Sequence, residues 1–234
     1  MTYGLKALSS NSTVQIDTDN ANKVIYQLAA SGTITVPSRA SMGLGYNSLN
    51  YVSNTITGVS AINPDYSLVF VKPSTAPTGS NTQSTFGETG SGSFTLYSSL
   101  ESTSYSYYVY NPTSSGTTNI IPAPTGYGLV VYAADGTTVR FSSDSIALRV
   151  QGVITDNGSV SGTGLIALQQ RKYTAIKPAA LSPAKYFAKV TTFGASSVTQ
   201  GEDIWFIGTT GTGASEEVEF NYLTATIRTI VAAV

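Results

Sequence analysis

The sequence lacks histidine and cysteine altogether, and only 11% of its 234 residues are charged. Without histidine, neither a Ser-His-Asp nor a Cys-His catalytic system can form, and His-ligated zinc is excluded as well. Without cysteine, there is no disulfide framework and no thiolate ligand for a metal. The remaining candidates are 13 acidic residues that follow no catalytic pattern. We therefore expect no enzyme activity, no catalytic residue, no cofactor and no metal site.

The low charge also limits the partners. Twelve basic and 13 acidic residues leave a net charge of −1, so no basic surface is expected to bind nucleic acid. Apolar stretches are strand-sized and shorter than the roughly 18 residues of a membrane span, so we expect no membrane insertion. The first residues lack the basic segment and apolar run of a signal peptide, which predicts synthesis in the cytoplasm without secretory export. A neutral surface of this kind favours packing in an assembly, with a secreted adhesin-like domain as the alternative.

The apolar pattern is that of strands throughout, and helix signals are nearly absent. The run from Leu68 to Val71 is continuously apolar and predicts a strand buried on both faces. Many short strands with Gly-rich turns predict an all-β protein of β-sandwich type. The expected strands cover residues 23–36, 68–71, 94–97, 105–110, 129–132, 139–141, 146–153, 165–168, 186–190, 204–207 and 218–234.

Two segments are predicted to be loops. Residues 73–93 are rich in Ser, Thr, Gly and Pro, which fits either a contact loop or a hairpin tip. The Pro-, Ser- and Thr-rich segment after residue 110 predicts a linker, which we place at 116–125.

A short sequence occurs twice. Tyr3-Gly4-Leu5 recurs as Tyr127-Gly128-Leu129, and Val14–Asp17 matches residues 139–142 after one inserted residue. Each copy places a turn between two short strands, so each predicts a hairpin. With the linker between the copies, the repeat predicts two β-sandwich-like domains, at 1–115 and 126–234. Chance similarity between two strand-like segments is the alternative.

Tyrosine is abundant, with 15 residues against 8 phenylalanines and 1 tryptophan. Tyrosine suits interfaces because its ring can be buried while its hydroxyl stays hydrated. We therefore select Tyr105, Tyr107, Tyr108 and Tyr110 as candidate interface residues. The alternative is that these rings form cross-strand pairs that stabilise the sheet itself.

The apolar C-terminal segment supplies further candidates. Its apolar face switches near residue 222, which indicates a bulge or a change of strand partner. Leu223, Ile227, Ile230 and Val231 are the candidate interface residues here. Such a segment either closes its own sheet or adds a strand to a neighbouring subunit.

Two patterns resemble ligand motifs only in part. Asp17-Thr18-Asp19-Asn20 begins like a calcium loop but lacks the turn glycine and the bidentate glutamate, so a weak calcium site at Asp17 and Asp19 stays open. Gly208–Gly213 is glycine-rich, yet no lysine follows it as in a phosphate loop, and we expect a hairpin loop.

One family resemblance emerges from these residues. Met1–Leu5 followed by Val14–Asp17 resembles the start of small virion proteins of tailed bacteriophages, of the kind found at tail tips and tail fibres. Gly126–Tyr132 with Asp135-Gly136 and Phe141–Ser143 looks like the middle segment of the same proteins. The chain departs from that pattern at residues 10–12, where a glycine-containing turn is more typical.

The resemblance implies a non-enzymatic, homo-oligomeric structural protein of the virion, associated with the tail, the tail tip or a fibre. Its partners would be other virion proteins, with a host-surface glycan or protein as an additional contact. A capsid decoration protein is one alternative. A glycan-binding module that uses the Tyr-rich strands and scattered acids, with or without cleavage, is the other.

Overall fold

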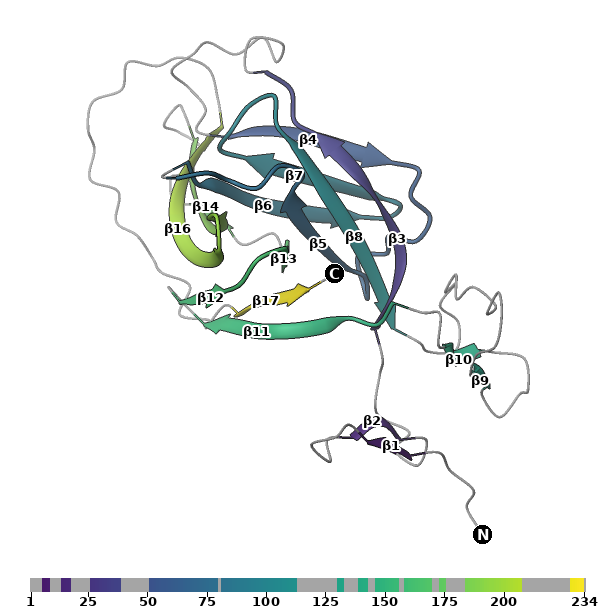
Figure 1. Ribbon diagram of the computed structural model, residues 1–234. Helices are drawn as coiled ribbons and strands as arrows, with labels where there is room; N and C mark the ends of the chain where they lie inside the picture. Colours follow the sequence, from purple (N-terminus) through teal and green to yellow (C-terminus); the bar gives the residue numbers. More distant parts are fainter. Residues whose placement is uncertain are drawn as a thin grey trace.

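The computed structural model describes residues 6–8, 14–17, 26–38, 51–79, 81–112, 130–132, 139–142, 146–155, 158–169, 173–175, 184–207 and 228–233. The regular structure of these residues is β, as the sequence predicts (Figure 1). In this part of the chain, no helix has the length and apolar character needed to cross a membrane.

The strands lie in the following order along the chain: β1 (Lys6–Leu8), β2 (Val14–Asp17), β3 (Tyr26–Thr35), β4 (Val52–Thr57), β5 (Leu68–Pro73), β6 (Gln83–Gly90), β7 (Ser93–Ser98), β8 (Ser104–Pro112), β9 (Val130–Tyr132), β10 (Val139–Ser142), β11 (Arg149–Thr155), β12 (Ser159–Ser161), β13 (Leu165–Leu168), β14 (Tyr173–Ala175), β15 (Ala184–Phe193), β16 (Ser197–Ile207) and β17 (Arg228–Ala233).

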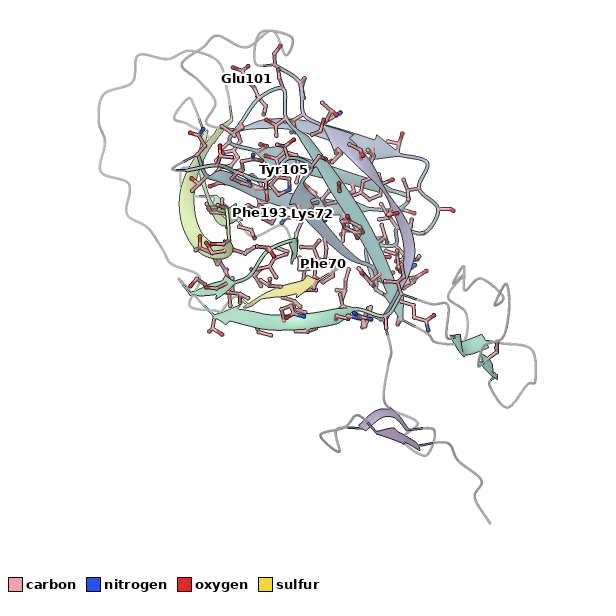
Figure 2. The ribbon with its side chains drawn as sticks, viewed as in Figure 1. Phe70, Lys72, Glu101, Tyr105 and Phe193 are labelled. Carbon is pink, nitrogen blue, oxygen red and sulfur yellow. The ribbon has the colours of Figure 1, made fainter. Side chains whose placement is uncertain are left out.

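Most of these strands belong to two antiparallel sheets. Sheet 1 has six strands in the order β11-β17-β13-β5-β8-β3. Sheet 2 has seven strands, six of them in the order β12-β16-β15-β6-β7-β4, with β14 paired to β15. A shared core of buried residues from both sheets, including Val71 and Tyr105 from sheet 1 and Phe94 and Phe193 from sheet 2, packs the two layers together (Figure 2).

Both sheets combine strands from the two predicted domains. In sheet 1, β5 pairs with β13 through Val71 and Ala167, and in sheet 2, β6 pairs with β15 through Thr85 and Thr191. The described strands therefore do not separate into groups at 1–115 and 126–234. The residues of the expected linker, 116–125, lie outside the described residues. Apolar patterns locate strands but do not identify their partners, so the sequence does not predict these two pairings.

Strand β5 is buried on both faces, which confirms the prediction from its continuous apolar run. Val69 and Val71 point into the shared core, and Phe70 on the opposite face belongs to a second cluster with Tyr110 and Ile166. The exposed fractions of Val69, Phe70 and Val71 do not exceed 1%.

The second cluster lies at the end of sheet 1 where β3 approaches the residues that lead into β11. Ala147 forms a bridge with Gln27 of β3, and the backbone N–H of Leu28 donates to the carbonyl of Ile146 at 2.9 Å. The N–H of Leu148 donates to the carbonyl of Tyr26 at the same distance. Because residues 146–148 lead directly into β11, the opposite edge strand, sheet 1 closes at this end into a partial barrel.

The two copies of the repeated sequence form two hairpins, as predicted. Each is a separate two-stranded antiparallel sheet, and Figure 1 shows both outside the two large sheets. The paired residues are Lys6 with Asp17, Ala7 with Ile16 and Leu8 with Val14 in the first hairpin, and Val130 with Ser142, Val131 with Phe141 and Tyr132 with Val139 in the second. The register and the irregularity before the last pair are the same in both, so the sequence match is also a structural one.

The prediction of a loop over residues 73–93 is wrong in its second half. Residues 83–90 form β6, and the chain then turns into β7 through Gly92, whose φ is +65°. The prediction failed because two of the inward-facing residues of β6, Gln83 and Thr85, are polar although they are buried. Alternating polarity therefore does not reveal this strand.

Candidate functional site

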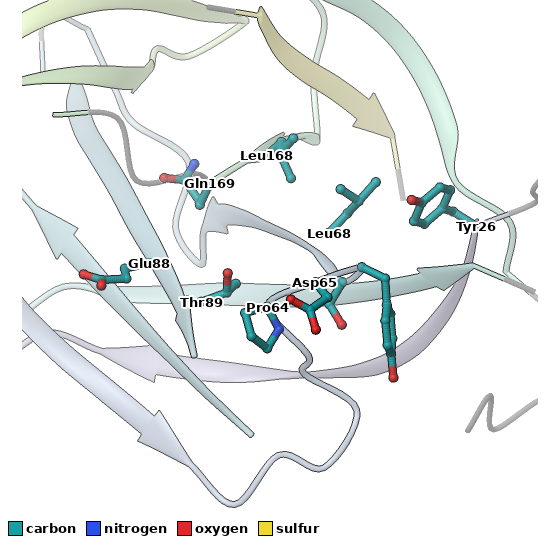
Figure 3. A pocket seen from close by; sticks show the side chains of 10 residues that line it. Tyr26, Pro64, Asp65, Leu68, Glu88, Thr89, Leu168 and Gln169 are labelled. Carbon is teal, nitrogen blue, oxygen red and sulfur yellow. The ribbon is translucent and has the colours of Figure 1, made fainter. Parts of the chain in front are cut away.

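A cavity of about 560 Å³ lies beside β6, between the turn at residues 63–67 and the end of β13 (Figure 3). Its apolar side chains include Leu68 and Leu168, and Tyr26 from the start of β3 lines another side. Glu88 and Thr89 of β6 line it as well (Figure 3). The volume is within the range of small-molecule sites, about 300–1,000 Å³.

Hydrogen bonds fix the turn that forms one wall. The side-chain oxygen of Asn63 accepts from the N–H of Asp65 at 2.9 Å, and the carbonyl of Asn63 accepts from the N–H of Ser67 at 2.9 Å. The Ser67 hydroxyl accepts from the N–H of Asn63 at 2.8 Å and donates to the amide oxygen of Asn111 at 2.7 Å. The turn therefore presents Asp65, which is exposed, and Tyr66, which is half-buried, in a defined position.

Gln169 supplies a buried amide at the opposite wall. Its side-chain oxygen accepts from the hydroxyl of Thr85 at 3.1 Å, and its amide nitrogen donates to the carbonyl of Ala167 at 3.2 Å. Its own backbone N–H donates to the carbonyl of Val69 at 2.8 Å. These contacts use the oxygen and one of the two N–H groups of the Gln169 amide, and they hold the amide in a defined position.

Gly87 allows Gln169 to approach β6 this closely. A Cβ at position 87 would lie 2.6 Å from the ring of Phe94 and 2.9 Å from the Cβ of Gln169. Both neighbours are buried. A larger residue at position 87 would therefore displace Gln169 from the cavity wall or disturb the packing of Phe94.

The cavity lies where sheet 2 opens. Strand β15 pairs with β6 only through Gln83, Ser84 and Thr85. Beyond Thr85, among the described strands, β6 is paired only with β7. Glu88 and Thr89, which line the cavity, belong to the part of β6 that does not pair with β15.

Two carboxylates line the cavity. They belong to Asp65 and Glu88, and none of the described residues that line it is a lysine or an arginine. No group of three or more acidic residues that could hold a metal ion occurs among the described residues. The described lining therefore offers carboxylate, amide and hydroxyl groups beside the apolar side chains of Leu68 and Leu168.

The candidate interface residues of β8 lie inside the chain. Tyr105, Tyr107 and Tyr110 are buried, and Tyr108 is partly buried with the Nζ of Lys72 5.8 Å from its ring centroid. The hydroxyl of Tyr105 is 2.6 Å from that of Ser98. Burial raises the pKa of Tyr105 to about 12, although the hydrogen bond to Ser98 acts in the opposite direction. These positions favour the alternative interpretation, in which the tyrosines stabilise the sheet.

Tyr110 packs edge-on against Phe70, with ring centroids 5.6 Å apart. Its hydroxyl is buried and has no hydrogen-bond partner in the described part of the chain. Burial raises the pKa of Tyr110, and the neighbouring Tyr108 raises it further, whereas Arg149 lowers it.

Two of the four candidate interface residues near the C-terminus lie in the described part of the chain, and two lie outside it. Ile230 and Val231 belong to β17, which pairs with both β11 and β13 inside sheet 1. Val231 is buried in the shared core, so this end of the chain closes its own sheet. Leu223 and Ile227 lie outside the described residues, as does Asp19 of the weak calcium motif.

The structure reveals an exposed apolar surface that we did not select from the sequence. Ile146, Val150 and Val153 are 49%, 52% and 51% exposed, respectively. Val150 and Val153 belong to β11, an edge strand of sheet 1 that pairs along its length only with β17 among the described strands. Exposed apolar edge strands are templates for pairing with another chain. The sequence predicts a strand over residues 146–153, but the apolar pattern of a strand does not show which of its side chains are exposed.

Comparisons with known proteins found no match among family models, curated proteins or solved structures.

Proposed function

We propose that this chain is a non-enzymatic structural protein of a tailed-bacteriophage virion, made in the host cytoplasm and incorporated in the tail, the tail tip or a fibre. The observation that carries the proposal is the pair of hairpins, which share one pairing register. The sequence of these hairpins is also the part of the chain that resembles small virion proteins.

The hairpins are suited to contacts with neighbouring virion proteins. An isolated two-stranded hairpin is marginally stable in water and gains stability when it packs against other structure. Neither hairpin pairs with a strand of the two large sheets in the described part of the chain. Two equivalent hairpins in one chain can therefore engage two equivalent binding positions in an assembly.

The edge of β11 is the surface that we propose for contact between copies of the chain. Val150 and Val153 lie opposite Ala232 and Ile230 of β17, so they extend the apolar surface of the second cluster to the outside. Few charges oppose association, since only 11% of the residues are charged. The tyrosines of β8, in contrast, are not available for this role because three of the four are buried.

Immunogold labelling of purified phage particles tests the proposal. We expect antibodies raised against this chain to label the tail, its tip or its fibres. Labelling of the capsid surface would instead support the decoration protein. Absence of the chain from purified virions, checked by mass spectrometry of the same particles, would refute a virion role of either kind.

A further inference from the structure

We propose that the buried amide of Gln200 binds an internal water molecule, which links it to the hydroxyl group of Thr191 on the neighbouring strand. This inference goes beyond the proposed virion function and does not depend on it, because it rests on the core face of sheet 2 alone. Three observations carry it: the Gln200 amide is buried and unsatisfied, Thr191 lies directly beside it, and further buried polar residues continue the same row.

The side chain of Gln200 is enclosed without a partner. Gln200 is 3% exposed, and neither its Oε1 nor its Nε2 has a hydrogen-bond partner in the described part of the chain. This state costs free energy, because the hydrogen bonds of the amide to solvent are lost on folding and are not replaced. Buried polar groups that lack a protein partner are typically bonded to an ordered water molecule. The amide of Gln200 therefore points to a bound water.

Gln200 and Thr191 face the shared core together. Gln200 lies two residues after Val198, which belongs to that core. Thr191 lies two residues before Phe193, another member of the same core. Side chains two positions apart on a strand share a face, so both polar residues point between the sheets. They also pair directly in the register of β15 and β16, which places their Cβ atoms about 4.5–5.5 Å apart.

The Thr191 hydroxyl is a suitable second partner for the water. A hydroxyl group donates one hydrogen bond and accepts two, and Thr191 is itself buried. It forms no direct hydrogen bond with the amide of Gln200, although the two residues are neighbours. Polar neighbours that do not bond directly are commonly joined by a bridging water. The backbone of Gln200 is already anchored, because its N–H donates to the carbonyl of Gly158 at 3.1 Å.

The water would complete a polar row across sheet 2. On the other side of Thr191, its partner is Thr85 of β6, which is fully buried. The Thr85 hydroxyl donates to Oε1 of Gln169 at 3.1 Å, and Gln169 directly follows β13 of sheet 1. The row thus runs from β16 through β15 and β6 to the end of β13. Buried polar networks that are fully bonded specify a unique packing, so the water would help to fix sheet 2 against sheet 1.

A crystal structure of the full chain that shows ordered waters tests the proposal directly. We expect a water oxygen within hydrogen-bond distance of both the Gln200 amide and the Thr191 hydroxyl. A protein group bonded directly to the Gln200 amide would overturn the inference, as would an amide with no bonded atom at all.

NMR spectroscopy of the isotope-labelled chain provides a second test, with variants. The side-chain amide protons of Gln200 should show a nuclear Overhauser effect to water, with the sign of a bound molecule. Thr191→Val removes the hydroxyl group and keeps a similar shape, so this effect should be lost. Thr192→Val is the matched control, because it makes the same change one residue along the strand, where the hydroxyl lies 2.8 Å from that of Ser84. It should keep the effect.

Dispersed amide spectra show whether both variants keep the fold, and the wild-type crystal structure decides if Thr191→Val does not. An Overhauser effect of equal size in Thr191→Val and the wild type would overturn the bridge to Thr191. Absence of the effect in the wild type would overturn the bound water itself. None of these results would affect the labelling of virions, so the two proposals fail separately.

Discussion

The hydroxyl groups of Ser98 and Tyr105 lie 2.6 Å apart inside the core, at a point where β7 ends and β8 begins. Tyr110 on the same strand is equally buried, but its hydroxyl has no hydrogen-bond partner in the described part of the chain. Two tyrosines of similar burial thus differ in whether their polar atom is satisfied. This difference makes the two residues an internal comparison for the contribution of a buried hydroxyl.

Replacement of each tyrosine by phenylalanine should have opposite effects. Tyr105→Phe removes a hydrogen bond and should lower the free energy of unfolding by about 1 kcal/mol. Tyr110→Phe removes an unsatisfied polar group and should leave that free energy unchanged or raise it by about 1 kcal/mol. Urea unfolding followed by tryptophan fluorescence measures both. A loss of more than about 1 kcal/mol in Tyr110→Phe would show that its hydroxyl has a partner.

Alkaline pH should destabilise the fold through Tyr105. Its pKa is raised to about 12 by burial, whereas an unfolded tyrosine ionises near pH 10. Below about pH 10 both states are protonated, so the stabilisation is fully present. Between about 10 and about 12 only the unfolded state loses the proton, and the free energy of unfolding should fall by about 1.4 kcal/mol per pH unit. Tyr105→Phe should have a shallower pH dependence over this range, and an unchanged slope in that variant would contradict the assignment.

The two halves of the chain should not fold separately. Fragments 1–115 and 126–234 each lack strands that complete both sheets, because β5 pairs with β13 and β6 with β15. We expect each fragment alone to give poorly dispersed amide NMR spectra and no cooperative thermal transition. Co-expression of the two fragments should restore both properties. A well-dispersed spectrum from either fragment alone would show that this part of the chain folds by itself, as the domain division predicted from the sequence requires.

The sequence predicts individual strands better than their arrangement. The apolar run of β5 and the repeated hairpins were recognisable because their signals are local. The pairing of β6 with β15 was not, because it depends on residues far apart in the chain, such as Ser84 and Thr192, whose hydroxyls lie 2.8 Å apart. Composition also could not separate core tyrosines from surface ones, because a tyrosine fits both places.

The cavity could be predicted only in part. The Asn-Pro-Asp sequence at residues 63–65 indicates a turn, and the structure has one there. The opposite wall comes from Glu88 in a segment predicted as a loop and from Gln169 at the end of β13. No sequence spacing relates these residues to the turn, because the two sheets bring them together.

Alanine at position 87 should affect both the core and the cavity. The new methyl group would lie 2.6 Å from the Phe94 ring and 2.9 Å from the Gln169 Cβ, so we expect a loss of about 1–3 kcal/mol in unfolding free energy. Gly201→Ala in β16 is the control, because no atom lies within 4 Å of its new methyl group. That variant should be neutral or stabilised by about 0.5 kcal/mol. Equal thermal midpoints for the two variants would contradict the close packing at Gly87.

Lysine on the exposed edge of β11 should reduce self-association. Val150 and Val153 are 52% and 51% exposed, so Val150→Lys and Val153→Lys add charge at the surface without removing side chains from the core. Charged residues on an edge strand oppose pairing with another chain. Multi-angle light scattering over a range of concentrations should therefore show a lower mass for the double variant than for the wild type.

The matched control for this experiment is Thr57→Lys in β4, an exposed residue on the edge strand of the other sheet. It adds one positive charge, as each single Val→Lys variant does, but lies outside the apolar surface of β11, so its mass should equal that of the wild type. If Thr57→Lys lowers the mass as much as a single Val→Lys variant does, general repulsion explains the result and β11 is not the contact. If neither lowers it, copies of the chain associate through another surface, and the two hairpins become the first segments to test.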